Sequence, residues 1–132
     1  MLSVMPGNNP YQQYKKSAAE TATPVKLLVM LFDGAIRFTS RAQNAIKEND
    51  FETANNMLLK VQDIFEELMF TLDKEKAEEI ALNLYDLYSF YRQEVIHINI
   101  TKNAERLNPV LEFLNDYRIV WVEAARLVRV GA

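Results

Sequence analysis

Apolar residues recur at alternating steps of three and four along four separate stretches of this chain. Residues 24–49 form the first stretch, and residues 51–72, preceded by Asp50 as a cap, form the second. The apolar seam of the first is Leu28, Leu31, Ala35, Phe38, Ala42 and Ala45. The seam of the second is Phe51, Ala54, Leu58, Val61, Phe65, Leu68 and Leu72. Because this spacing puts each set on one face of an α-helix, both stretches are predicted to be helices that bury one stripe.

The same alternation continues in the second half of the chain, over residues 77–100 and 109–128. The third seam is Ala81, Leu84, Tyr88, Tyr91, Val95 and Ile98. The fourth seam is Val110, Leu114, Tyr117, Trp121, Ala124 and Val128. Asn108 before Pro109 predicts a cap followed by the first helical residue, as Thr23 before Pro24 does for the first helix.

Glycine and proline are too rare for a β-rich domain. Between Pro24 and Pro109 there is one glycine, Gly34, and no proline, whereas a β domain needs frequent turns. Long helices with short connections predict an all-α fold, an antiparallel four-helix bundle over residues 24–128. Residues 1–23 are expected to form a flexible N-terminal cap segment, extended or with a short helix, and residues 129–132 a short tail.

Composition narrows the classes of function. The chain of 132 residues has no cysteine and a formal net charge of −3, so thiolate zinc sites are excluded and the basic footprint of a nucleic-acid binder is missing. No run of about 18 apolar residues suggests a membrane span, and the first ten residues do not resemble a signal peptide. We therefore expect a cytoplasmic protein that neither binds nucleic acid nor inserts into a membrane.

Catalytic and metal-binding patterns are incomplete. Glu94 and His97 have the Glu-x-x-His spacing of di-iron helical bundles, but that site needs a second such motif and His97 is the only histidine. No glycine-rich phosphate loop and no serine in a glycine elbow are present. We predict no catalytic, cofactor or metal site, and the chain is not expected to be an enzyme.

The first and third helices carry more apolar surface than one core seam requires. The surplus residues are Val25, Val29, Met30, Phe32, Leu82, Tyr85, Ile96 and Ile100. This surplus apolar surface could be covered in three ways: by neighbouring helices of the bundle, by a second copy of the chain in a homodimer, or by the amphipathic helix of a partner. Tyr11 and Tyr14, which the four seams do not need, are expected to cover or line the same surface.

Several motifs in a fixed order resemble one protein family. They are Asn9-Pro10-Tyr11-x-x-Tyr14, Thr21-Ala22-Thr23-Pro24, Leu27 to Phe38, Asn83-Leu84-x-x-Leu87-Tyr88, Ile98-Asn99-Ile100 and Trp121. Over about residues 9–125 the chain is similar to the flagellar export chaperones of the FliS type. It departs from the pattern of that family at Lys26, Ala77-Glu78, Gln93-Glu94 and Ile98.

The resemblance implies a helical bundle that wraps the disordered C-terminal segment of flagellin in hydrophobic grooves. Such a chaperone prevents premature polymerisation and helps to deliver flagellin to the flagellar export gate. The ten surplus and N-terminal residues named above would then form a partner-binding surface. Two alternatives remain: an adaptor of the same fold that sequesters a flagellar regulatory protein, and a self-associating structural bundle.

Overall fold

A computed structural model describes residues 24–72 and 78–129 of the chain. Its elements are α2 (Pro24–Lys47), α3 (Phe51–Phe70), α4 (Glu78–Thr101), the 3₁₀ turn η1 (Ala104–Arg106) and α5 (Leu107–Arg129). Tyr11, Tyr14 and the proposed cap Thr23 lie outside the described residues. Four long helices and no strand are found within the described part, which confirms the all-α helical bundle.

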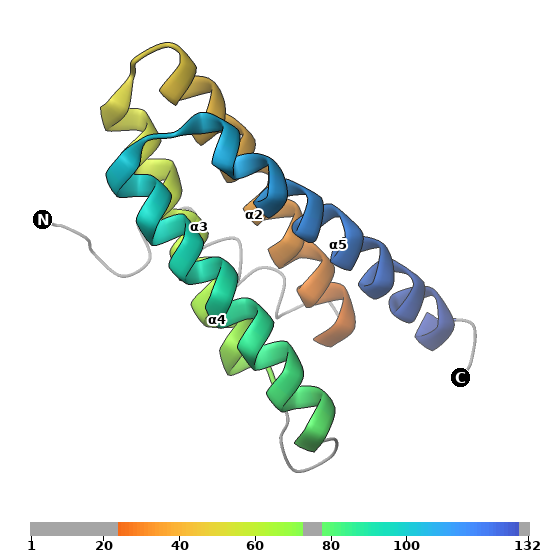
Figure 1. The fold of residues 1–132 in the computed structure, drawn as a ribbon. Helices are drawn as coiled ribbons and strands as arrows, with labels where there is room; N and C mark the ends of the chain where they lie inside the picture. Colours follow the sequence, from red (N-terminus) through yellow and green to blue (C-terminus); the bar gives the residue numbers. More distant parts are fainter. Residues whose placement is uncertain (1–23, 73–77, 130–132) are drawn as a thin grey trace, which may run out of the picture.

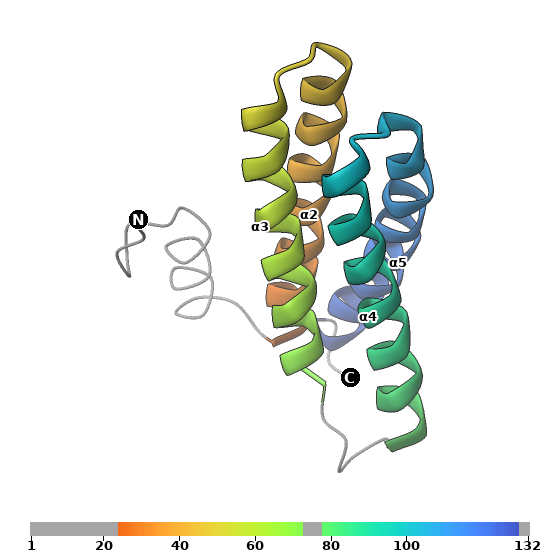
Figure 2. The same ribbon diagram turned by 60° about the vertical axis from the view of Figure 1, so that its left-hand side comes forward.

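The helices run alternately up and down the bundle (Figure 1). The turn from α2 to α3 and the turn from α4 to α5 lie at the same end, as both views show (Figures 1 and 2). Helix α2 packs against both α3 and α5, and α3 packs against α4. The backbones of α4 and α5 approach each other much less, so the bundle is wider on that side.

Side chains occupy the wide side of the bundle in place of backbone contact. The ring of Phe113 on α5 stacks on Tyr91 of α4 with centroids 4.1 Å apart, and it meets Tyr88 edge-on at 6.3 Å. Tyr117 lies 4.6 Å from the same ring along α5. Aromatic pairs at these distances are favourable beyond the area that they bury, so this aromatic cluster joins α4 to α5.

A capping residue explains where α3 begins. Asp50 is the cap of α3, and its carboxylate accepts a hydrogen bond from the backbone N–H of Thr53 at 3.2 Å. The prediction of this cap is therefore confirmed. Asn49, with φ of 61°, makes the left-handed turn that separates α2 from α3.

The prediction that the last helix begins at Pro109 is wrong by two residues. Asn103 caps η1, which continues directly into α5 at Leu107. Pro109 therefore falls in the first turn of α5, where a backbone N–H has no intrahelical partner and its loss costs nothing. The side chain of Asn108 instead accepts a hydrogen bond from Gln43 on α2 at 2.8 Å.

Most seam residues lie in one core. The fully buried large side chains include Tyr88, Phe65, Leu31, Leu58, Leu68, Ile98 and Leu114. Phe51 is the exception among the predicted seams, because it is the first residue of α3, at the end of the bundle, and is 47% exposed. The side chain of Val128 lies outside the described part.

Candidate partner-binding surface

The predicted surplus on α2 is mostly covered by the bundle. Val25, Val29 and Met30 are half-buried. Phe32 is 0% exposed, and its ring packs against that of Tyr88 at 6.3 Å. The assignment of Phe32 to an accessible partner surface is corrected here: α2 has two helical neighbours, and Phe32 points between them toward α4.

The predicted surplus on α4 is largely exposed. Leu82, Tyr85 and Ile100 are 43%, 37% and 76% exposed, and Ile96 is half-buried. On the same side of α4, Arg92 pairs with Glu66 of α3 at 3.3 Å and Asn99 donates to Asn55 of α3 at 2.9 Å. Of the four apolar residues, Tyr85 lies at the seam between α3 and α4, where it lines a pocket together with residues of α3.

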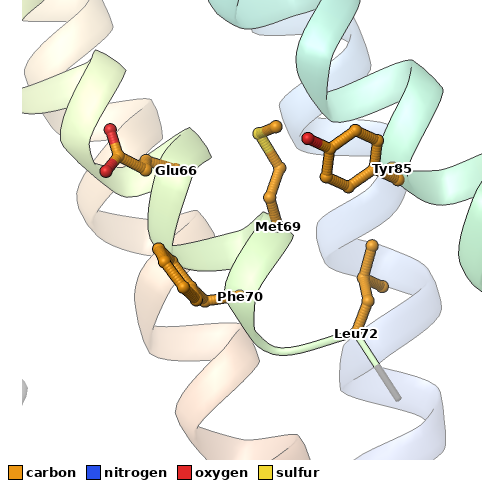
Figure 3. Close-up of a pocket in the computed structure, with 5 residues that line it drawn as sticks. All are labelled: Glu66, Met69, Phe70, Leu72 and Tyr85. Atoms are coloured by element: carbon orange, nitrogen blue, oxygen red, sulfur yellow. The ribbon is translucent and has the colours of Figure 1, made fainter. Parts of the chain in front are cut away.

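A groove opens at the lower end of this seam. Glu66, Met69, Phe70, Leu72 and Tyr85 line this α3–α4 groove, whose volume is about 380 Å³. Figure 3 shows Met69 and Tyr85 pointing into the space between the two helices. Phe70 is 78% exposed. The flexible thioether side chain of Met69 adapts to apolar partners of different shape, so the groove is suited to bind apolar side chains of a polypeptide.

Sequence reasoning missed Met69 and Phe70 as members of the surface. Both lie off the seam of the second helix, and their position near the end of that helix could have indicated that no neighbour covers them. Leu72 was assigned to the core and is half-buried at the groove.

A second groove, the α4–α5 groove, lies beside the aromatic cluster. Its volume is about 330 Å³, and its lining is Leu87, Tyr91, Pro109, Glu112, Phe113, Asp116 and Tyr117. Glu112 and Asp116 are exposed and four residues apart on α5, so two carboxylates stand together at its edge. The helical period alone does not show this groove, because it arises from the wide spacing of α4 and α5.

A smaller cavity, the end pocket, lies where α2 begins and α5 nears its end. It measures about 170 Å³ and is lined by Leu28, Thr71, Leu72, Ile80, Ala81, Leu84, Tyr88 and Trp121. Tyr88 Oη and Trp121 Nε1 are buried, and within the described residues neither has a hydrogen-bond partner. Burial raises the pKa of Tyr88 to about 12, an effect that the nearby Trp121 only partly offsets, so the hydroxyl stays protonated at neutral pH.

Charged groups on the surface form isolated pairs. The pKa of the Asp63 carboxyl group is raised, first by burial and then by the neighbouring Glu66.

His97 is exposed. Across residues 24–72 and 78–129 no three potential metal ligands come together. In the same ranges, no helix combines the length and apolarity that crossing a bilayer requires.

These features define a class of protein: a small helical bundle whose described residues form apolar grooves between helices. The chain matches the family model described as Flagellar protein FliS over residues 7–128, and it belongs to the FliS family. The resemblance seen in the sequence motifs is thereby confirmed.

Curated relatives agree with the family. The chain is 32% identical over 121 residues to the flagellar secretion chaperone FliS of Bacillus subtilis, covering 92% of this chain and 90% of the relative. It is 34% identical over 119 residues to the protein of the same name from Campylobacter jejuni, covering 90% and 93%. The FliS of Salmonella typhimurium is 32% identical over 107 residues, covering 80% and 79%.

Proposed function

We propose that this chain is a cytoplasmic export chaperone that binds the disordered C-terminal segment of flagellin. In this role it prevents premature polymerisation and delivers flagellin to the flagellar secretion apparatus, with a component of the export gate as a second partner. Family membership and the names of the relatives, which are secretion chaperones, support this role. The structural observation that carries it is the apolar α3–α4 groove, together with the exposed apolar residues of α4.

The mechanism needs no nucleotide and no covalent step. Amphipathic turns of flagellin bury their apolar faces against the α3–α4 groove and the exposed apolar residues of α4, and this burial supplies the free energy of binding. Ordering the disordered segment opposes part of that gain. Apolar residues that join subunits in the filament are then withheld until export.

The surface that we propose differs from the sequence prediction at a few positions. Val25, Val29, Met30, Leu82, Tyr85, Ile96 and Ile100 remain, Met69, Phe70 and Leu72 are added, and Phe32 is removed. Tyr11 and Tyr14 are proposed to clasp the bound segment rather than only to cover the groove.

Calorimetry with a peptide of the flagellin C-terminal segment tests the function. We expect binding of about one peptide per chain, with a negative heat-capacity change because apolar surface is buried. The affinity should change little with salt, since the groove residues are mostly uncharged. No binding would contradict the chaperone role. Self-association without the peptide, measured by light scattering, would favour the structural-bundle alternative, and binding of a flagellar regulatory protein alone would favour the adaptor.

A further inference from the structure

The end pocket combines an apolar lining with buried polar atoms that are left unpaired. α2 contributes Leu28, α5 contributes Trp121 and α4 contributes Tyr88, among others. Tyr88 is 0% exposed and lines the pocket. Among the described residues no charged side chain lines it, so they offer an ionic ligand no compensation for its lost hydration. The pocket therefore suits a neutral, mostly apolar group.

Two polar groups of the lining, Tyr88 Oη and Trp121 Nε1, make no hydrogen bond of normal geometry within the described residues. The indole N–H of Trp121 lies near the phenol oxygen of Tyr88 and acts on it as a weak donor, so the hydroxyl proton of Tyr88 is left without an acceptor. The hydroxyl of Thr71, also in the lining, is already engaged because it donates to the carbonyl oxygen of Leu68 at 2.6 Å. A buried polar group without a hydrogen bond destabilises a fold. The phenol hydroxyl is a donor at neutral pH, so the complementary group is an acceptor such as a carbonyl oxygen.

The volume of the pocket limits the size of its occupant. A dry cavity of about 150 Å³ holds a benzene molecule, and the end pocket measures about 170 Å³. One large aliphatic or aromatic side chain therefore fits in the pocket. A residue such as leucine or phenylalanine offers that side chain and a main-chain carbonyl beside it.

We propose that the end pocket is an anchor subsite for one large apolar side chain of the bound polypeptide, whose adjacent main-chain carbonyl accepts a hydrogen bond from the hydroxyl of Tyr88. The inference rests on the proposed function in that the occupant is a polypeptide. It adds a specific contact to the grooves, and it gives the buried hydroxyl of Tyr88 a hydrogen-bond acceptor.

The variant Tyr88→Phe removes the hydroxyl and keeps the ring contacts with Phe32 and Phe113. We expect an equal or higher melting temperature, because an unpaired buried hydroxyl is lost. The affinity for the flagellin C-terminal peptide should fall about tenfold, as expected for one lost hydrogen bond in a desolvated site. Tyr91→Phe, the same chemical change in the α4–α5 groove, is the matched control and should change affinity less than about twofold.

Trp121 is the only tryptophan of the chain, so its emission reports on the pocket directly. N-acetyl-leucinamide carries a side chain and carbonyls, whereas N-acetyl-glycinamide lacks the side chain. We expect only the leucine probe to change the emission of the full-length protein, and Ala81→Leu, which fills the pocket, to abolish that change.

Two results would overturn the subsite: an unchanged Trp121 emission with the leucine probe, or equal peptide affinity of Tyr88→Phe and the unsubstituted chain. In either case, a peptide that still binds the unsubstituted chain would leave the proposed function standing. The reverse result, a response to the leucine probe without flagellin binding, would contradict the proposed function and support the subsite for another polypeptide.

Discussion

At the scale of single residues, Gly34 illustrates how closely α2 and α3 approach. A Cβ atom at this buried position would meet the Cδ1 atom of Ile64 at 3.4 Å. That atom is the end of a flexible side chain and can move. Glycine inside a helix costs about 1 kcal/mol relative to alanine, so backbone preference and packing act in opposite directions here.

We expect Gly34→Ala to increase the free energy of unfolding by up to about 1 kcal/mol, because the helix preference exceeds the small adjustment of Ile64. Urea denaturation measures the change. As a control, Ala35→Gly on the same buried helix should lower the free energy of unfolding by about 1 kcal/mol or more. A loss of stability in Gly34→Ala would show that the contact with Ile64 is rigid.

Two residues of α3 that are close in sequence differ sharply in burial. Leu68 is 0% exposed, whereas Glu66 is exposed and pairs with Arg92 at 3.3 Å. Leu68→Asp should unfold the bundle, since it buries an unpaired charge. Glu66→Ala should change the free energy of unfolding by less than about 0.5 kcal/mol, because exposed ion pairs contribute little. Circular dichroism during thermal unfolding distinguishes the two, and similar effects would mean that the register of α3 is misassigned.

Tyr88 is expected to make stability depend on alkaline pH. Burial raises its pKa to about 12, above the ordinary value of about 10 for tyrosine, so the folded chain holds this proton more tightly than the unfolded chain. The stabilisation is complete below about pH 10 and is lost as the pH rises toward 12. Urea denaturation measures the free energy of unfolding of the unsubstituted chain and of Tyr88→Phe. Between pH 9.5 and 11.5 this free energy should fall further in the unsubstituted chain, by a difference on the order of 2 kcal/mol. Parallel losses would refute this.

At the scale of helices, the spacing of apolar residues predicts most core positions, whereas capping residues and neighbouring helices determine where a helix begins and which of its faces are covered. The period places Leu58, Phe65 and Leu68 in the core without any tertiary information, and all three are fully buried. It misplaces the start of α5, because η1 and its Asn103 cap extend the helix before Pro109. It also predicts Phe32 to be accessible although the residue is buried. The spacing of apolar residues shows which faces of a helix are apolar, but not how many neighbouring helices cover them.

Exposed groove residues should matter for binding and not for folding. Phe70 on α3 is 78% exposed in the α3–α4 groove, and Ile119 on α5 is 65% exposed outside the lining of the described grooves. We expect Phe70→Ser to weaken flagellin-peptide binding at least tenfold, as loss of a large aromatic contact does. Ile119→Ser should leave it nearly unchanged, and both should keep the melting temperature. Titration calorimetry measures the pair, and equal affinities would remove the groove from the proposed site.

At the scale of the whole molecule, two positions that depart from the family pattern serve this bundle. Glu94 pairs with Arg106 at 3.0 Å and so ties α4 to η1. Ile98 is fully buried in the core. The chain accommodates both residues within its own packing, so these differences are compatible with the FliS fold.

The sequence by itself determined the class of fold, the four helices, most core positions, the cap at Asp50 and the family. These depend on interactions within one helix or on residue order, which a linear pattern records. Only the tertiary structure decided which apolar residues are exposed and where the grooves and the end pocket lie. Those features depend on the spacing between α4 and its neighbours and on pairs far apart in sequence, such as Tyr88 with Trp121. No local period contains that information, since helices of the same pattern can pack at different distances.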